Sequence, residues 1–314
     1  SKFDMRTGNE VARYYTGPVS GGCSQAQPSR MSVDADGNLW VINRAVRYVT
    51  VVQILNDAFI DRNGDSQEQT SRDLNNNGCI DPNEILPWGQ DERVARVYAI
   101  RRPNGDIPGI NQLGRAVIVD SNGYIWAGLW NEGRVVQIAP DLDPFQYSPA
   151  AWTDACSQPP PQLYPMLLES VSTLPDARPY GLALAPNGFL YGASIDYYSI
   201  FEICPGNPSV PGDAQLTRVI NIQARTGQSF WTYGIAVDQQ CRVWTVNHAD
   251  GSNAGRIAGY DPGTDTLVLS NQTFGGFWRG CTVDPTGCIW TAATSPSGMV
   301  AKWCIPNFND PSTW

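Results

Sequence analysis

Five stretches of the chain repeat one alternation of apolar and polar positions. Each has a short apolar strand, a four-residue turn of the Asp-x-x-Gly kind, and a second apolar strand that carries an aromatic residue. Turn residues between two such runs predict a β-hairpin in each repeat. The repeats begin at Met31, Val117, Leu182, Ile235 and Cys281, and their aromatic residues are Trp40, Trp126, Tyr191, Trp244 and Trp290.

Further strands surround each hairpin. A third strand follows it, as in YVTVVQIL (48–55), and a more variable fourth strand precedes the next hairpin, as in LTRVINIQ (216–223). Four antiparallel strands per unit, repeated radially, predict an all-β fold, a β-propeller. We expect five blades, or six if a degenerate unit lies in residues 141–177. The last unit lacks a fourth strand, and residues 10–17 are predicted to supply it and close the ring.

The repeats predict a single β-propeller domain over residues 1–314 with two insertions. Residues 56–95 separate the third and fourth strands of the first blade. Residues 141–177 are rich in Pro and aromatic residues, which is typical of an extended loop that faces a partner.

The first insertion contains DLNNNGCIDPNE, residues 73–84. An EF-hand-type loop takes oxygen ligands at positions 1, 3, 5, 7, 9 and 12 and needs Gly at position 6. Counting from Asp73 places Gly78 at position 6, so the segment predicts a Ca²⁺ site. Its predicted ligands are Asp73, Asn75, Asn77, the backbone carbonyl of Cys79, Asp81 and Glu84.

Just upstream, DRNGDSQEQTSR (61–72) begins in the same way with Asp61, Asn63 and Asp65. It then departs from the pattern, because Ser66 stands at position 6 and Arg72 at position 12. A second calcium site is one interpretation of this segment, and a solvated acidic loop is the other.

The flanks of the calcium loop argue against a calcium sensor, which needs two amphipathic helices. A strand-like segment precedes the loop, and Pro87 follows Glu84 within three residues, so no long exit helix is expected. The insertion has few apolar residues with which to order itself. We therefore predict that the ion fastens residues 56–95 to the propeller.

Charge and cysteine content limit the possible partners and the cellular compartment. A net charge of −9 without a Lys/Arg run argues against nucleic-acid binding, and no stretch has the ~18 apolar residues of a membrane helix. Eight cysteines without a C-x-x-C pair predict disulfides rather than zinc, with Cys156 a candidate partner for Cys204. We expect a secreted, extracellular or periplasmic protein, mature after removal of a signal peptide.

The segments VDADGNLWV (33–41), VDSNGYIWAG (119–128) and GRVVQI (133–138) resemble blades of the NHL and streptogramin-lyase group of propellers. The resemblance implies a β-propeller whose site lies in the central funnel. Lyases of that group use two histidines and a glutamate with magnesium, whereas His248 is the only histidine of this chain. The lyase activity is therefore not carried over.

Gluconolactonase-like propellers instead hold a divalent ion with Glu, Asn and Asp in the channel. By that resemblance the counterparts would be Asn43, Asn131, Asp196 and Asn247. The simpler interpretation of these four residues is polar turn positions after strands.

Residues at the ends of the hairpin strands are expected to reach the funnel. Arginine and aromatic side chains there suit a carboxylate or sulfate group, or a sugar stacked on a ring. The candidate ligand-binding residues are Arg30, Arg44, Arg115, Trp130, Tyr180, Tyr233, His248 and Arg279.

Two function classes remain open from the sequence. The first is a calcium-stabilised extracellular binding or assembly module for a glycan or a protein. The second is a metal-dependent lyase or lactonase-type hydrolase with its site in the funnel. The sequence favours the non-catalytic module, because the catalytic groups of the similar enzymes are missing.

Overall fold

The computed structural model is divided into two compact units. The first comprises residues 1–125 and 138–167, and the second comprises residues 126–137 and 168–314. The described residues are 1–19, 26–44, 48–101, 112–140, 143, 145–155, 157–207, 209–248, 255–295 and 298–314.

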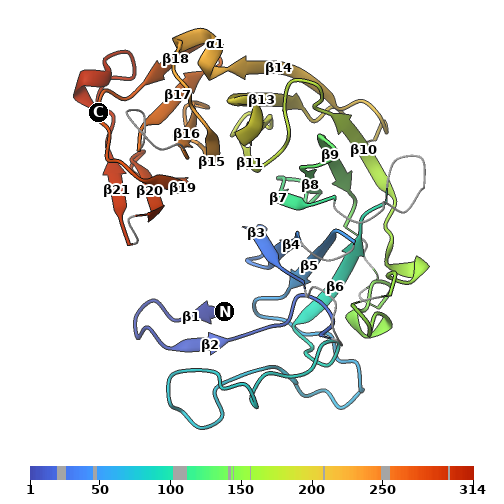
Figure 1. Ribbon diagram of the computed structural model, residues 1–314. Coiled ribbons are helices and arrows are strands. Elements are labelled where there is room, and N and C mark those ends of the chain that lie inside the picture. The colour runs from blue at the N-terminus through green and yellow to red at the C-terminus, as the bar shows by residue number, and fades with distance from the viewer. Residues whose placement is uncertain are drawn as a thin grey trace. The chain divides into compact units, whose positions relative to one another are not determined.

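The strands form five antiparallel sheets, the blades of a β-propeller (Figure 1). The first blade has β3 (Pro28–Val33), β4 (Leu39–Asn43), β5 (Thr50–Ile54) and β6 (Val94–Ala99). The second has β7 (Gly114–Val119), β8 (Ile125–Leu129), β9 (Arg134–Ile138) and β10 (Leu167–Ser172). The third has β11 (Gly181–Leu184), β12 (Leu190–Ser194), β13 (Ser199–Cys204) and β14 (Gln215–Asn221). The fourth has β15 (Thr232–Val237), β16 (Val243–Asn247), β17 (Ile257–Asp261) and β18 (Thr266–Leu269). The fifth has β19 (Phe277–Val283), β20 (Ile289–Ser295) and β21 (Val300–Trp303).

The prediction of five blades is confirmed. The described residues of 141–177 do not hold a sixth sheet, because their strand β10 is the outer strand of the second blade. Helix is scarce in the described residues: α1 (Ile222–Thr226) is the one α-helix, beside four 3₁₀ turns. No helix in this part of the chain is long and apolar enough to span a membrane.

In three blades the hairpin turn is tied to the aromatic residue of its repeat. In the first blade, Asp34 accepts a hydrogen bond from the backbone N of Asn38 at 2.8 Å and from Trp40 Nε1 at 2.9 Å. Gly37 has φ of +81°, a conformation that glycine adopts without steric cost. The same indole-to-carboxylate bond joins Trp244 to Asp238 at 2.9 Å and Trp290 to Asp284 at 2.8 Å.

Apolar side chains fill the space within each unit. In the first unit, Trp40 stacks on Tyr98 with ring centroids 5.9 Å apart. In the second, buried Trp244 and Trp278 belong to one core cluster, and Tyr260 belongs to another. The alternating pattern of the strands therefore builds the core, as the repeats predict.

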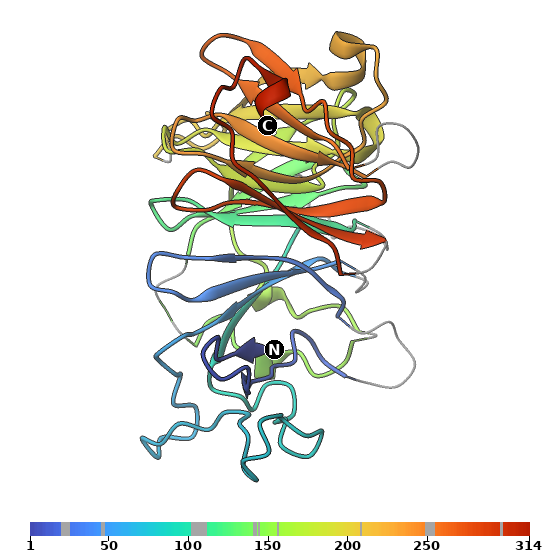
Figure 2. The same cartoon turned by 90° about the vertical axis from the view of Figure 1, so that its left-hand side faces the viewer.

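The N-terminal strands belong to the first unit. β2 (Glu10–Ala12) pairs with β1 (Lys2–Phe3), while the described strands of the fifth blade number three. The fifth blade belongs to the other unit, so the expectation that residues 10–17 supply its fourth strand stays a prediction. Buried Glu10 bonds to the first insertion, and its backbone N donates to Gly78 O at 2.9 Å. Figures 1 and 2 show β1 and β2 beside the loops of that insertion.

The second insertion turns its aromatic residues inward. Tyr147 packs against Tyr98 of β6 at 4.7 Å, and buried Trp152 accepts a hydrogen bond at its backbone O from Trp88 Nε1 at 2.6 Å. Among its large aromatic residues, Phe145 is exposed. The expected partner-facing loop is thus mostly a packed cover on the first unit.

The cysteines give a mixed result. Cys288 and Cys304 form a disulfide that ties β20 to the residue after β21. Cys79, Cys204, Cys241 and Cys281 are free thiols, so the pairing of Cys204 with Cys156 is wrong. Cys23 and Cys156 lie outside the described residues.

Candidate functional site

In the loop at residues 73–84, Asp and Asn side chains accept hydrogen bonds from backbone N–H groups of the same loop. Asp73 Oδ2 accepts from Gly78 N at 2.8 Å, and Asn75 Oδ1 accepts from Asn77 N at 3.0 Å. Asn77 Oδ1 accepts from Cys79 N at 2.8 Å. Gly78 has φ of +85°, so the bend at position 6 uses the conformational freedom of glycine.

Buried Glu84 closes this loop from position 12. Its Oε1 accepts from the backbone N of Leu74 at 3.0 Å, and its Oε2 accepts from the backbone N of Asp81 at 2.8 Å. The side-chain amides of Asn75 and Asn77 both reach Asp81 Oδ2, at 2.8 and 3.1 Å. The side chains of Asn75, Asn77 and Asp81, at positions 3, 5 and 9, therefore meet. A flip of the two side-chain amides by about 180° would point their oxygens, instead of their nitrogens, toward Asp81. No helix flanks the loop.

The loop at residues 61–69 repeats this geometry. Asp61 Oδ2 accepts from Ser66 N, five residues on, at 2.9 Å, and its Oδ1 accepts from Gly64 N at 2.7 Å. Asn63 Oδ1 accepts from Asp65 N at 3.0 Å. Ser66 takes φ of +59° where the first loop has a glycine, so the same bend is made with a serine.

Glu92 takes the place of the missing position 12 in this second loop. Its Oε1 accepts from the backbone N of Arg62 and its Oε2 from the backbone N of Gln69, both at 2.9 Å. Arg62 and Gln69 are positions 2 and 9, the same positions that donate to Glu84 in the other loop. The carboxylate is buried. The sequence pattern missed it because Glu92 lies 20 residues beyond Arg72.

Other buried carboxylates fix the two loops to the first blade. Asp91 Oδ2 accepts from Ser71 N at 2.8 Å and from Ser71 Oγ at 2.7 Å. The Arg62 guanidinium donates to the backbone O of Asp91 at 2.9 Å and of Val94, in β6, at 2.5 Å. Burial lowers the pKa of Arg62. Each buried acceptor here has a donor, as the cost of desolvation requires.

Glu10 joins the N-terminal segment to the first of these loops. Its carboxylate accepts from Arg13 Nε at 2.7 Å and from Ile80 N at 3.0 Å. The hydrogen bond from Arg13 lowers the pKa of Glu10 to about 2. No three His, Cys, Asp or Glu side chains in the described residues are grouped so that they could hold a metal ion. A calcium ligand set at either loop would thus include amide and backbone oxygens.

A second candidate site lies in the other unit and is called here the aromatic–arginine cluster. Tyr180 and Tyr233 are buried at its centre, with ring centroids 4.5 Å apart and hydroxyl oxygens 3.1 Å apart. Trp130 packs edge-on to Tyr180 at 6.2 Å, and His248 lies 4.6 Å from Tyr233. The cluster comprises Trp130, Arg178, Tyr180, Tyr233, His248, Phe277 and Arg279.

Two arginines border these rings. The Arg279 guanidinium lies 5.3 Å from the Tyr233 ring centroid, and that of Arg178 lies 5.7 Å from the Trp130 ring. Arg178 also pairs with Asp196 across 3.8 Å. Arg279 is exposed and forms no ion pair in the part of the chain that the structure describes. It presents cationic N–H donors beside an aromatic surface, which suits a planar anion.

Five of the eight predicted funnel residues therefore come together in this cluster. Sequence reasoning missed Arg178 and Phe277, which lie two residues before Tyr180 and Arg279. The other three predicted residues, Arg30, Arg44 and Arg115, belong to the first unit. Of these, Arg44 is held by Gln27, whose Oε1 accepts from its Nε at 3.2 Å.

The asparagines suggested as lactonase-type ligands include two with structural roles. Asn43 is fully buried, and its Oδ1 accepts from Thr16 Oγ1 at 2.9 Å. Asn247, at the corresponding end of β16, is also fully buried and accepts from Trp231 N at 2.9 Å. Both amides fasten the chain that leads into the blade, in line with their interpretation as polar turn positions.

Comparisons with known proteins agree with the arrangement of strands. A virginiamycin B lyase from Staphylococcus aureus has a TM-score of 0.52 at 12% identity, over 90% of this chain and 72% of its own. A protein from Lactobacillus plantarum gives 0.51 at 11%, over 90% and 72%. The β-propeller domain of Cps50 (Swd1) from Myceliophteria thermophila gives 0.50 at 13%, over 96% and 88%.

The chain is a β-propeller. At these identities the likeness shows the fold alone, because one propeller fold supports many functions. No protein-family model matches the sequence, and no curated protein is similar enough to match. The function of this propeller must therefore be inferred from its own residues.

Proposed function

We propose that this propeller is a non-catalytic extracellular binding module that takes an acidic glycan on the aromatic–arginine cluster. The supporting observation is Arg279, an exposed guanidinium 5.3 Å from the Tyr233 ring and without an ion-pair partner among the described residues. In a protein of net charge −9, such a group favours an anionic ligand. Trp130 and His248 offer ring faces and edges for a sugar.

An extracellular setting is part of this proposal. The Cys288–Cys304 disulfide supports it, because disulfides persist in oxidising compartments. The net charge of −9 also suits a protein that binds acidic polymers through one localised cationic patch rather than through its whole surface.

The test is calorimetric titration with an oligogalacturonate and with its methyl ester, which has the same sugar backbone without charge. We expect binding of the acid form and little binding of the ester. Arg279→Ala should weaken binding about tenfold or more, because a hydrogen bond to a charged group contributes about 1.5–3 kcal/mol. Arg225→Ala is the matched control, since Arg225 lies in the same unit and pairs with Asp265 at 3.1 Å. Equal affinity for acid and ester would contradict the proposal.

We also propose that calcium fills both loops of the first insertion and fastens it to the first blade. The support is the shared hydrogen-bond geometry of the two loops, with Glu84 closing one and Glu92 closing the other. The proposed ligands of the first site are those the sequence predicts, and those of the second are Asp61, Asn63, Asp65 and Glu92. Calcium near millimolar would fill even a modest site.

No observation in the part of the chain that the structure describes favours the lyase or hydrolase alternative. His248 is the chain's single histidine, and it packs between Tyr233 and Phe277. The virginiamycin B lyase named above is similar to this chain in fold alone. We therefore keep the binding module as the proposed function.

A further inference from the structure

A second pair of aromatic rings lies in the same unit as the aromatic–arginine cluster. Trp231, which directly precedes β15 of the fourth blade, is 41% exposed. Its ring centroid lies 6.3 Å from that of Tyr198, which stands between the 3₁₀ turn Ile195–Tyr197 and β13 of the third blade. Both residues belong to the second unit. These two rings are called here the aromatic platform.

The backbone connects Trp231 to the cluster. Trp231 N donates to Asn247 Oδ1 at 2.9 Å, and Trp231 O accepts from the backbone N of His248 at 2.9 Å. Trp231 also stands two residues before Tyr233, whose ring is at the centre of the cluster. The platform is therefore adjacent to the cluster on the fourth blade.

Tyr198 has an unusual backbone conformation. Its φ is +54°, in a region that bulky residues rarely adopt and that persists only where the surrounding structure imposes it. Here its backbone O accepts from Ile222 N, at the start of α1, at 2.8 Å. The ring of the preceding Tyr197 lies 6.0 Å from the guanidinium of Arg178, a member of the cluster. On the third blade, too, the platform adjoins the cluster.

Buried hydroxyl groups fix the two halves of the platform to one another. Thr232 Oγ1 accepts from Ser194 N at 3.0 Å and donates to Ser199 O at 3.0 Å, and all three residues are fully buried. Thr232 follows Trp231, and Ser199 follows Tyr198, so these bonds join the residues next to each ring. A platform held in this way is preorganised, which lowers the entropic cost of binding.

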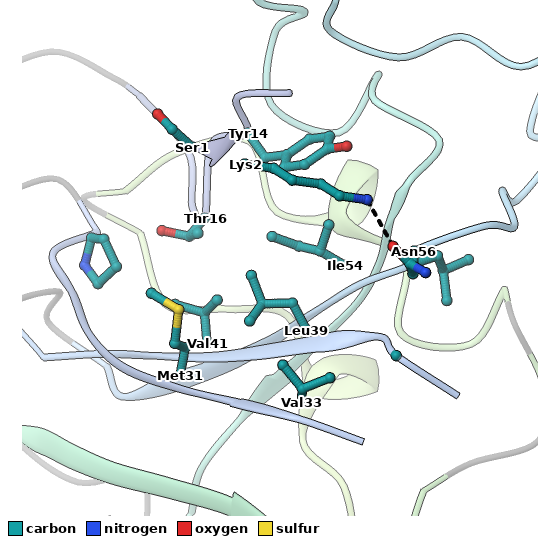
Figure 3. A pocket seen from close by; sticks show the side chains of 13 residues that line it. Ser1, Lys2, Tyr14, Thr16, Met31, Val33, Leu39, Val41, Ile54 and Asn56 are labelled. Atoms are coloured by element: carbon teal, nitrogen blue, oxygen red, sulfur yellow. Dashed lines mark hydrogen bonds between the residues drawn. The ribbon is translucent and has the colours of Figure 1, made fainter. Parts of the chain in front are cut away.

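The first unit has a hollow of about 310 Å³, whose chemistry differs from that of the platform. Figure 3 shows aliphatic Met31, Leu39 and Val41 along its wall. Its cation is already engaged, because Lys2 Nζ donates to Asn56 Oδ1 at 2.7 Å. Burying hydroxyl groups against aliphatic side chains is unfavourable, so this hollow does not suit a sugar.

We propose that the aromatic platform takes a further sugar ring of the glycan that binds the aromatic–arginine cluster, an inference that rests on the proposed function. Trp and Tyr rings present apolar faces to the C–H groups of a sugar and polar edges to its hydroxyls. Neither ring is charged, so the platform should take an esterified sugar as readily as an acidic one. Arg279 supplies the preference for charge, and the platform adds affinity for longer chains.

The test is calorimetric titration with oligogalacturonates of two and of six units. The wild type should bind the longer chain about tenfold more tightly, because only that chain reaches both the cluster and the platform. Trp231→Ala should keep the wild-type affinity for the shorter chain and lose the gain with length. Tyr198→Gly should do the same, since glycine removes the ring and adopts positive φ without steric cost. Arg279→Ala should weaken the binding of both chains by the same factor.

Phe145→Ala is the matched control, because Phe145 is an exposed aromatic residue of the first unit, and this variant should bind both chains as the wild type does. Circular dichroism checks the fold of each variant, and if Trp231→Ala unfolds, Tyr198→Gly answers the same question.

The outcomes distinguish the platform from the proposed function. Equal wild-type affinity for the two chains would overturn the platform and leave the proposed function standing, and so would an unchanged gain with length in the folded platform variants. A gain with length among the methyl esters that Trp231→Ala removes would support the platform and contradict the requirement for charge. Absence of binding by every chain, acid or ester, would overturn both.

Discussion

The blades and the first insertion are ordered by different forces. The repeats bury apolar side chains, and the aromatic column lies in the core of four of the five blades. Residues 56–95 instead surround buried carboxylates, among them Glu84, Asp91 and Glu92, whose oxygens accept hydrogen bonds from backbone N–H groups. Hydrophobic burial is non-directional, whereas these hydrogen bonds demand particular donors at particular distances.

The two regions should therefore be sensitive to different substitutions. Removing a core aromatic leaves a cavity and weakens the whole fold. Removing a buried carboxylate leaves several donors without an acceptor, and the loss is local because the blades do not depend on them.

The core tryptophans should differ by position. Trp244 is fully buried against Trp314 at 5.3 Å, so Trp244→Ala should lower the free energy of unfolding by about 3–5 kcal/mol. Trp290→Ala removes a partly exposed ring, and we expect a loss of about 1 kcal/mol. Denaturant unfolding of both variants measures the difference. Equal losses would contradict the expected dependence on the burial of each ring.

Glu92→Ala should release the insertion and leave the blades folded. The backbone N–H groups of Arg62 and Gln69 would lose their acceptor, at a cost of about 2–3 kcal/mol to local order. Limited proteolysis should then cut within residues 56–95. Asp57→Asn, at an exposed aspartate of the same insertion, should resist cleavage as the wild type does. A Glu92→Ala protein that resists proteolysis as well as the wild type would show that this carboxylate does not order the insertion.

Metal content distinguishes the two loops. We expect two calcium ions per chain, one of which is lost in Glu84→Gln and the other in Glu92→Gln. Arg72→Ala should keep both, because Arg72 stands at position 12 by count while Glu92 fills that place in space. A site with Kd of ~10⁻⁴ M adds about 1.4 kcal/mol of stability at 1 mM calcium. Elemental analysis after dialysis gives the stoichiometry, and loss of an ion in Arg72→Ala would disprove the role of Glu92.

Stability should also depend on pH through Glu10. Its pKa is lowered from an ordinary value of 4.5 to about 2, so the folded state favours the charged form. Its contribution to stability is therefore full above about pH 4.5 and is lost as the pH falls toward 2. The difference in unfolding free energy between wild type and Glu10→Gln should shrink over that interval. A difference that is constant from pH 5 to pH 2 would rule out this linkage.

The fold could be predicted from the sequence because its signals are local. The five turns and the aromatic column lie within single repeats, so strands, hairpins and blade number follow from neighbouring residues. The internal geometry of loop 73–84 is local for the same reason. Non-local partners were not accessible: Glu92 acts on a loop that begins at Asp61, and Glu10 binds the backbone of Ile80.

The funnel residues show an intermediate case. Strand ends placed Tyr180, Tyr233 and His248 correctly near one another, since each blade contributes equivalent positions. Arg178 and Phe277 stand two residues before Tyr180 and Arg279, outside the position at each strand entry that the repeats mark. Side-chain packing decides which arginines have a carboxylate partner. Arg178 pairs with Asp196, whereas Arg279 lies beside the Tyr233 ring.

Hydrogen exchange, followed by mass spectrometry with and without a calcium chelator, tests the contrast between blades and insertion most directly. The account predicts that chelation removes protection from peptides within residues 56–95, including the amides of Ser71 and Gly78, and leaves the strands of the blades unchanged. Unchanged protection of the insertion after the metal is removed, or an equal loss across the blades, would contradict it.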